Sequence, residues 1–223
     1  GSGSGSADAG GSAVAPIEDA PPSDMNGTDE NPDAPRDTLN PTGVTVTPLG
    51  FGAAPLGNLY RAVDDRTAAE AVAAAWDAGV RYFDTAPWYG RGLSELRTGA
   101  GLRYKPRDEY ILSTKIGRYL KHQIPGSNTD LSPWKAPTLF DVIFDYSYDG
   151  IMRSFEDSLQ RLGLARIDIL YVHDIGVYQH GKEAHPGLMR TLREGGYRAL
   201  EKLRGGGAVR AIGIGVNERE VLL

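Results

Sequence analysis

The hydrophobic pattern of the chain changes character at residue 44. From there on, short and nearly continuous apolar runs alternate with longer stretches of helical periodicity. Such runs are typical of strands buried on both faces of a parallel sheet. We predict five of them, at residues 49–53, 80–85, 108–117, 166–174 and 209–215.

The segments between these strands carry helix signals. Residues 67–79 are rich in alanine, the best helix former, with Thr67 and Glu70 at the spacing of a capping box and Gly79 at the end. Residues 149–163 place their apolar side chains on one helical face. We predict helices at 67–79, 149–163 and 196–207, another ahead of residue 108, and the start of one more at 217–223.

A repeated strand–helix order predicts an α/β protein whose parallel sheet is covered by helices. A doubly wound sheet would place a G-x-G-x-x-G motif between its first strand and helix. Residues 50–57 read GFGAAPLG, which has the wrong spacing. We therefore interpret these glycines as tight packing at a strand end. The alternative, a (β/α)8 barrel, expects reactive residues at the carboxyl ends of several strands.

Polar residues stand where four of the predicted strands end. Asp84 closes the second strand and Tyr89 follows in its loop, while Lys115 and His173 end the third and fourth. The fifth strand runs out to Asn217. Taken singly, each residue also fits a structural role, such as a cap, a solvated strand end or a core histidine. Because the strand ends of a barrel converge on one mouth, together they predict a TIM-type barrel with an active site there.

The residue types fit one chemistry. A tyrosine ordinarily keeps its proton up to pH about 10, and a neighbouring ammonium such as that of Lys115 favours the phenolate form. Asp84 can supply the counter-charge that a buried lysine needs, and His173 can donate a hydrogen bond to a substrate oxygen. A tyrosine proton donor without a nucleophile suggests interconversion of a carbonyl and an alcohol, with hydride from a bound cofactor.

The amino-acid composition restricts the classes of binding partner and the cellular compartment that we expect. Residues 1–43 contain eight Asp and Glu and one Arg, so their net charge is −7. The net charge of the whole chain is −5, which leaves +2 for the other residues. This Gly-, Ser-, Ala- and Pro-rich tail is expected to be disordered. The rest is nearly neutral, so we expect no nucleic-acid partner, and no apolar run approaches the roughly 20 residues that span a bilayer. The absence of cysteine fits a reducing cytoplasm, where we expect the protein to be. A homo-oligomer stays open.

Four motifs in order, FDTAPWYG, LSTKIG, YVHD and AIGIGVNE, resemble the aldo-keto reductase family. The longer stretch 144–174 is similar to its subgroup of aldose 1-dehydrogenases (L-fucose, D-threo-aldose) and pyridoxal 4-dehydrogenases. The resemblance covers about residues 44–223. It implies an NAD(P)-dependent oxidoreductase acting on a sugar or a small aldehyde or alcohol, with NAD favoured over NADP by the subgroup.

Residue by residue, the resemblance implies a catalytic tetrad of Asp84, Tyr89, Lys115 and His173. In that tetrad Tyr89 transfers the proton, Lys115 and Asp84 tune it, and His173 orients the carbonyl.

Binding residues are implied in the same way. Trp88 would line the substrate pocket. Independently of the resemblance, segment 118–140 is long with scattered Pro and Gly, so we expect either a lid, in which Tyr119 and Trp134 touch substrate, or a disordered loop. Asn217 would bind the nicotinamide carboxamide, and Gly52 is expected at the cofactor. The serine that precedes this asparagine in the family is missing here, which leaves open a displacement of Asn217 by one residue.

The length departs from the family. A (β/α)8 barrel typically has about 250 residues and eight strands, whereas we find five strands in about 180 residues. We therefore expect an incomplete barrel from a longer reading frame, and no activity if the chain is complete as it stands.

Other functions remain alternatives. An NADPH-dependent aldehyde reductase would use the same residues in reverse. A nucleotide-sensing auxiliary subunit would keep the tetrad without turnover, and an inactive fragment would bind no cofactor.

A histidine-rich stretch raises the question of a metal. His173, His180 and His185 lie close in sequence, with Asp174 and Glu183 between them. Their spacing matches no compact helical pair of ligands, and we interpret this stretch, from residue 176 to 187, as a loop. We predict no metal site.

Overall fold

The computed structural model describes residues 37–39, 42–123 and 130–222. Most of the tail expected to be disordered therefore lies outside the described residues. Within that tail, however, β1 (Asp37–Leu39) is a strand, paired antiparallel with β2 (Val44–Val46). The expectation of disorder is wrong for these three residues, because their backbone groups find partners in β2.

Five parallel strands form the main sheet, in the order β3-β4-β5-β8-β9. Their bounds are Phe51–Gly52, Tyr82–Asp84, Ile111–Ile116, Ile169–His173 and Ala211–Gly215. All five lie within the predicted runs. Because their order in the sheet follows their order in the chain, every connection advances in one direction, as in a barrel. The strand order of a doubly wound sheet would reverse at a switch point.

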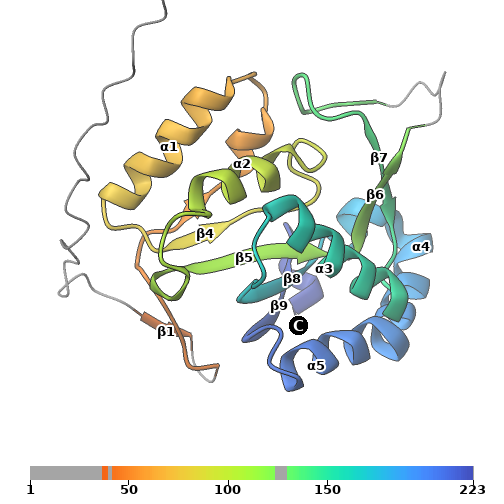
Figure 1. Cartoon of the computed structure of the whole chain (residues 1–223). Helices are drawn as coiled ribbons and strands as arrows, with labels where there is room; N and C mark the ends of the chain where they lie inside the picture. Colours follow the sequence, from red (N-terminus) through yellow and green to blue (C-terminus); the bar gives the residue numbers. More distant parts are fainter. Residues whose placement is uncertain (1–36, 40–41, 124–129, 223) are drawn as a thin grey trace, which may run out of the picture. The chain divides into compact units, whose positions relative to one another are not determined.

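Helices lie between the strands in sequence and cover one face of the sheet. The α-helices are α1 (Asp65–Asp77), α2 (Leu93–Leu102), α3 (Tyr148–Leu162), α4 (Val177–Thr191) and α5 (Tyr197–Gly205). Shorter helical turns are η1 (Ala54–Gly57), η2 (Arg107–Glu109), the π-turn η3 (Leu192–Gly196) and η4 (Arg219–Leu222). Figure 1 shows α1, α2 and α3 side by side in front of the strands, and α3 also contacts α5.

Alternation along the strands gives the sheet two different faces. The helix-facing residues are apolar and fully buried: Phe83, Leu112 and Leu170. The opposite face carries polar groups, where Tyr82 Oη lies 3.2 Å from both Tyr171 Oη and Ser113 Oγ. This second face corresponds to the inside of a barrel.

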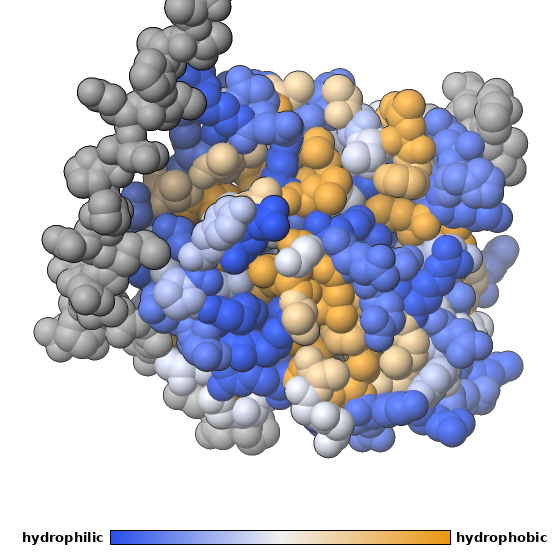
Figure 2. All heavy atoms as spheres, viewed as in Figure 1, coloured by the Kyte–Doolittle hydropathy of each residue, from blue (hydrophilic) through white to orange (hydrophobic). Residues whose placement is uncertain are grey.

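The exposed side of the helices is a mixture of side-chain types. Figure 2 shows hydrophobic residues reaching the surface over the region of α3 and near β7, between hydrophilic ones. Leu96, Leu139 and Phe140 are among the exposed large hydrophobic residues. Single exposed side chains of this kind are normal on a protein surface.

Helix ends follow the sequence signals only in part. Thr67 does not cap α1; the carboxylate of Asp64 accepts a hydrogen bond from the Thr67 N–H at 2.7 Å, so the helix begins earlier than predicted. Asp64 is the N-cap because aspartate is at least as favourable as threonine at this position and stands three residues before Thr67. Gly79 and Gly163 do end α1 and α3, both with positive φ, as predicted.

Two segments interpreted as loops contain regular structure. Residues 176–187 fall largely in α4, although the backbone leaves helical geometry at Gly181, where φ is 76° and ψ 163°. Because Gly181 and Pro186 disfavour a helix, the sequence did not indicate α4, whose later turns pack on the core. Residues 118–140 contain β6 (Arg118–His122) and the start of β7 (Phe140–Phe144), which form an antiparallel hairpin. The expected 217–223 helix begins as the 3-10 turn η4.

Candidate active site

The register of the sheet brings the polar strand ends together. Asp84 is level with Ser113 on β5, and Lys115, two residues further along, is level with Tyr171 on β8. His173 stands two residues beyond Tyr171. Residues two apart on a strand share a face. Asp84, Lys115 and His173 therefore lie on the same face of three neighbouring strands, at their carboxyl ends.

Lys115 and Asp84 form a close ion pair. The Lys115 ammonium donates to Asp84 Oδ2 at 2.7 Å and to the carbonyl oxygen of Thr85 at 2.9 Å. The other carboxylate oxygen, Oδ1, accepts from Ser113 Oγ at 2.6 Å. Both groups are held by hydrogen bonds to neighbouring elements, so the position of the ammonium is fixed.

The pair keeps the lysine charged although it is buried. Burial by itself would lower the pKa of Lys115, because desolvation disfavours the ammonium. The negative charge of Asp84, and after it the Tyr89 hydroxyl, outweighs burial and raises the pKa of Lys115. A fixed positive charge therefore stands at the mouth at neutral pH.

Tyr89 reaches Lys115 from the loop after β4. The Lys115 Nζ lies 4.6 Å from the centroid of the Tyr89 ring. Two glycines make this loop position possible: a Cβ on Gly57 would lie 2.5 Å from the Tyr89 carbonyl carbon, and one on Gly90 would lie 2.5 Å from the Gly57 oxygen. The interpretation of the 50–57 glycines as tight packing is thus confirmed at Gly57 and is wrong at Gly52, where a Cβ would meet nothing within 4 Å.

His173 completes the group as a neutral imidazole. Its ring packs edge-on against that of Tyr89, with centroids 6.0 Å apart and an interplanar angle of 88°. Burial, followed by the positive charges of Arg118 and Lys115, lowers the pKa of His173 well below its usual value. A neutral ring carries one N–H, which can donate a hydrogen bond to a substrate oxygen.

Two tryptophan rings lie near Tyr89, with Trp134 packed against Tyr89 and Trp88 packed against Trp134. The Trp134 ring lies 5.8 Å from that of Tyr89 and 5.6 Å from that of Trp88. Trp134 is buried, it forms an isolated antiparallel bridge with Leu59, and the next residue donates a hydrogen bond from Lys135 N to Asn58 O at 2.9 Å. The part of 118–140 that contains Trp134 therefore lies over the predicted site.

A cavity opens beside Trp88. Its volume is about 390 Å³, and its lining includes Trp88, Arg91, Arg118, Phe144 and Gln179. This size lies within the range of small-molecule pockets. Trp88 thus lines a cavity; that this cavity is the substrate pocket stays a prediction.

The other predicted binding residues are placed as follows. Gly52 is level with Asp84, and a Cβ built on it would meet nothing within 4 Å. Asn217 is exposed after β9, with its Nδ2 3.5 Å from Asp174 Oδ1. Both are compatible with a cofactor at the mouth, because one leaves space beside Asp84 and the other presents an amide there. Tyr119 instead packs under the Arg153 guanidinium, 3.9 Å from its ring centroid.

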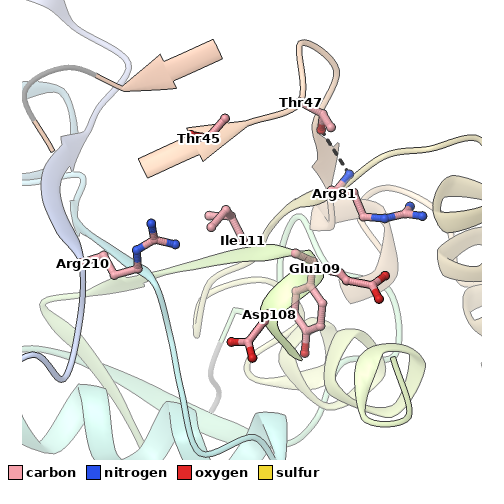
Figure 3. A pocket seen from close by; sticks show the side chains of 8 residues that line it. Thr45, Thr47, Arg81, Asp108, Glu109, Ile111 and Arg210 are labelled. Atoms are coloured by element: carbon pink, nitrogen blue, oxygen red, sulfur yellow. Dashed lines mark hydrogen bonds between the residues drawn. The ribbon is translucent and has the colours of Figure 1, made fainter. Parts of the chain in front are cut away.

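A second cavity lies away from this group, at the amino ends of the strands. Its volume is about 180 Å³, and Figure 3 shows Thr45, Arg81, Ile111 and Arg210 around it. It contains none of the predicted site residues. The predicted chemistry is therefore confined to the carboxyl end of the sheet.

The histidine-rich stretch forms hydrogen bonds and aromatic contacts. His180 Nε2 lies 2.9 Å from Tyr146 Oη, whose proton goes to the His173 carbonyl oxygen at 2.7 Å. Among the described residues, no three His, Cys, Asp or Glu side chains are grouped to hold a metal ion. In the same part of the chain, no helix is long and apolar enough to cross a membrane.

Sequence reasoning missed several residues around the site. Ser113 and the Thr85 carbonyl hold the ion pair, and Arg118 forms a buried ion pair with Asp174 beside His173. Ser113 could have been found, because it stands two residues before Lys115 and must share its face. Nothing in the spacing indicates that Arg118 meets Asp174.

Comparisons with known proteins agree with this arrangement. The chain is 45% identical to pyridoxal 4-dehydrogenase of Microbacterium luteolum over 192 residues, 82% of this chain and 56% of that protein. It is 45% identical to D-threo-aldose 1-dehydrogenase of a Pseudomonas species over 177 residues, 78% of this chain and 51% of that protein. The chain thus spans about half the length of these relatives.

The same holds for solved structures. An aldo-keto reductase of Bacillus halodurans in its holo form superposes with a TM-score of 0.62 at 25% identity, covering 84% of this chain and 52% of that one. The five parallel strands are accordingly part of a TIM-type barrel. The family model described as "Aldo/keto reductase family" matches residues 48–222 of the chain. The chain therefore belongs to the aldo/keto reductase family.

Proposed function

We propose that this chain carries the catalytic tetrad of an NAD(P)-dependent dehydrogenase that oxidises a sugar or another small alcohol. The observation that carries this proposal is the Lys115–Asp84 ion pair beneath Tyr89, with His173 packed edge-on against the same ring. This group combines a fixed cation, a phenol and a neutral hydrogen-bond donor. No member of it is a nucleophile poised by a base.

Each residue has a part in the oxidation. Tyr89 takes the proton of the alcohol hydroxyl, and Lys115 stabilises the negative charge on the phenol oxygen before that transfer. His173 donates a hydrogen bond to the same substrate oxygen and orients it. Asp84 holds the ammonium in place and balances its charge. As the O–H and C–H bonds of the substrate break, a carbonyl forms; from a sugar hemiacetal the product is a lactone.

Asn217 and Gly52 would hold the cofactor at the mouth. Asn217 offers an exposed amide, and Gly52 leaves open space next to Asp84. When bound, the nicotinamide accepts the hydride that leaves the substrate carbon. NAD(P) use is a general property of the family; that NAD is preferred to NADP is our prediction from the subgroup.

Similar proteins support the alcohol-oxidising direction. Besides the pyridoxal and D-threo-aldose dehydrogenases, L-galactose dehydrogenase of Arabidopsis thaliana is 35% identical over 167 residues, 73% of this chain and 46% of that protein. Two of these three names refer to aldose oxidation. We therefore predict an aldose as the substrate and Trp88 as a substrate contact. We also propose a cytoplasmic location, in keeping with the absence of cysteine.

A titration of the 223-residue chain with NAD+ and NADP+, followed by tryptophan fluorescence, tests cofactor binding. Reduced-nicotinamide absorbance on addition of L-fucose or a D-threo-aldose then tests turnover. We expect Tyr89→Phe to bind cofactor but to lose about 10²–10⁴-fold in turnover. The matched control Tyr104→Phe, which removes an exposed hydroxyl, is expected to behave like the wild type.

The alternatives give different results. Faster reduction of aldehydes with NADPH than oxidation of sugars would favour an aldehyde reductase. Cofactor binding without any turnover would favour a nucleotide-sensing subunit. Absence of cofactor binding by the soluble chain would contradict the proposal for this stretch of sequence.

A further inference from the structure

Asp174 stands in an unusual place directly after His173. Its φ is +49°, in the left-handed region that residues other than glycine seldom adopt. Its N–H nevertheless donates to the Gly215 oxygen at 2.9 Å, so the pairing of β8 with β9 continues through this residue. Such backbone geometry persists only where the surroundings hold it. It turns the Asp174 side chain toward groups that other strands supply.

Three groups from separate elements meet the Asp174 carboxylate. Arg118, at the start of β6, forms an ion pair with Oδ2. His173 Nε2 lies 3.4 Å from the same oxygen, and Asn217 Nδ2, after β9, lies 3.5 Å from Oδ1. The carboxylate thus lies between a predicted substrate-orienting residue and a predicted cofactor-binding residue.

We propose that Asp174 is a positioning residue for the proposed reaction, which fixes the His173 ring and the Asn217 amide relative to each other. This inference rests on the proposed function for the roles of those two residues. Its structural part, the orientation of His173 by Asp174, stands on the contacts alone.

The contacts favour one tautomer of His173. Nε2 has a carboxylate oxygen as its neighbour, whereas the buried Nδ1 has no hydrogen-bond partner in the structure. The Nε2 contact is not a hydrogen bond in the structure, but the carboxylate charge stabilises a proton on Nε2 and disfavours a lone pair there. A proton on buried Nδ1 would remain unsatisfied. Asp174 therefore favours the Nε2–H form through its charge, and because it does not hold this N–H in a hydrogen bond, the N–H is available to a substrate oxygen.

Arg118 holds the carboxylate in its turn. The guanidinium is buried, 4.6 Å from the Phe144 ring centroid and 5.3 Å from that of Trp88. An arginine wedged between two aromatic faces has little freedom to move. Burial is the main cause that lowers the pKa of His173, with the charge of Arg118 after it, so the ring is expected to stay neutral next to the carboxylate also when Arg118 is replaced.

A simpler role must be separated from this one, namely that Asp174 only neutralises buried Arg118. Asp174→Asn leaves the arginine unpaired, which is costly for folding. We therefore compare the double variant Arg118→Met/Asp174→Asn with Arg118→Met alone. Neither variant has the buried cation, so a purely charge-balancing Asp174 has nothing left to balance in either, and the two variants would be equal in turnover and in their Kd for NAD+.

We expect the double variant to turn over about 10–100-fold more slowly than Arg118→Met, because small misplacements of reacting groups have effects of that size. We also expect a several-fold higher Kd for NAD+. Equal values in the two variants would overturn the proposal. Asp108→Asn, which removes the exposed carboxylate that pairs with Arg166 at 2.7 Å, is the matched control and is expected to leave both values unchanged.

A measurement without cofactor or substrate tests the structural part. Ring-nitrogen chemical shifts of ¹⁵N-histidine-labelled protein report the tautomer of His173. We expect Nε2–H in Arg118→Met and a mixture of both tautomers in the double variant. An unchanged tautomer would show that Asp174 does not orient the ring. If the wild type shows no turnover, the proposed function fails while this readout still decides the positioning of His173.

Discussion

Both ends of the parallel sheet hold a carboxylate paired with a cation, yet the two pairs differ in their burial and their surroundings. At the amino end, Asp168 is fully buried; its Oδ2 accepts from Arg107 at 2.7 Å and from the Leu112 N–H at 2.8 Å. At the carboxyl end, the side chain of Asp84 keeps 26% of its surface exposed and binds Lys115 at 2.7 Å.

The neighbours of each pair explain the difference. The Asp168 pair ties η2 and the start of β5 to the start of β8, using backbone groups on both sides. The Lys115 pair has the Tyr89 phenol and the His173 ring beside it, and neither side chain takes part in the backbone pairing of the sheet. A buried ion pair is therefore not by itself a sign of function. What indicates function here is a proton-transfer group next to the pair at an open edge.

The largest effect that we expect is on turnover, from removing the cation at the carboxyl end of the sheet. Lys115→Met removes the cation beneath Tyr89, and we expect turnover to fall by about 10²–10⁴-fold. Stability should fall little, because partly exposed Asp84 can be hydrated. Lys202→Met, on an exposed position of α5, is the control. A Lys115→Met protein that turns over at the control rate would remove the basis for the proposed mechanism.

The corresponding change at the amino end should act on stability. Asp168→Ala leaves Arg107 unpaired and the buried Leu112 N–H without its acceptor, so we expect the free energy of unfolding to fall by about 3 kcal/mol. Chemical denaturation measures it. Asp108→Ala, which removes an exposed partner of Arg166, is expected to change it little. If both variants were equally stable, the Asp168 pair would not link these elements as described.

A smaller effect is expected from moving the Tyr89 loop. Gly57→Ala places a methyl group 2.5 Å from the Tyr89 carbonyl carbon, so this loop must shift. We expect turnover to fall by about tenfold to 10²-fold. Gly187→Ala adds a methyl group in α4 with nothing within 4 Å and is the matched control. Equal turnover in the two variants would show that the position of Tyr89 tolerates the shift.

Much of the fold was readable from the chain because its signals are local. The five strands of the sheet lie within the predicted runs, and Gly79 and Gly163 end their helices. Local signals failed where two of them competed. Asp64 capped α1 in place of Thr67, and Gly181 with Pro186 concealed α4, which tertiary packing stabilises against its weak propensity.

The sequence by itself determined which strand ends carry Asp84, Lys115 and His173, since parallel strands in chain order bring their carboxyl ends to one edge. Only the tertiary structure decided what surrounds them. Arg118 meets Asp174 across 56 residues of sequence, and Trp134 reaches Tyr89 from a segment after β6. Contacts of this kind depend on distances between elements, which no spacing along the chain encodes. The pattern of the chain therefore located the chemistry, and packing decided its geometry.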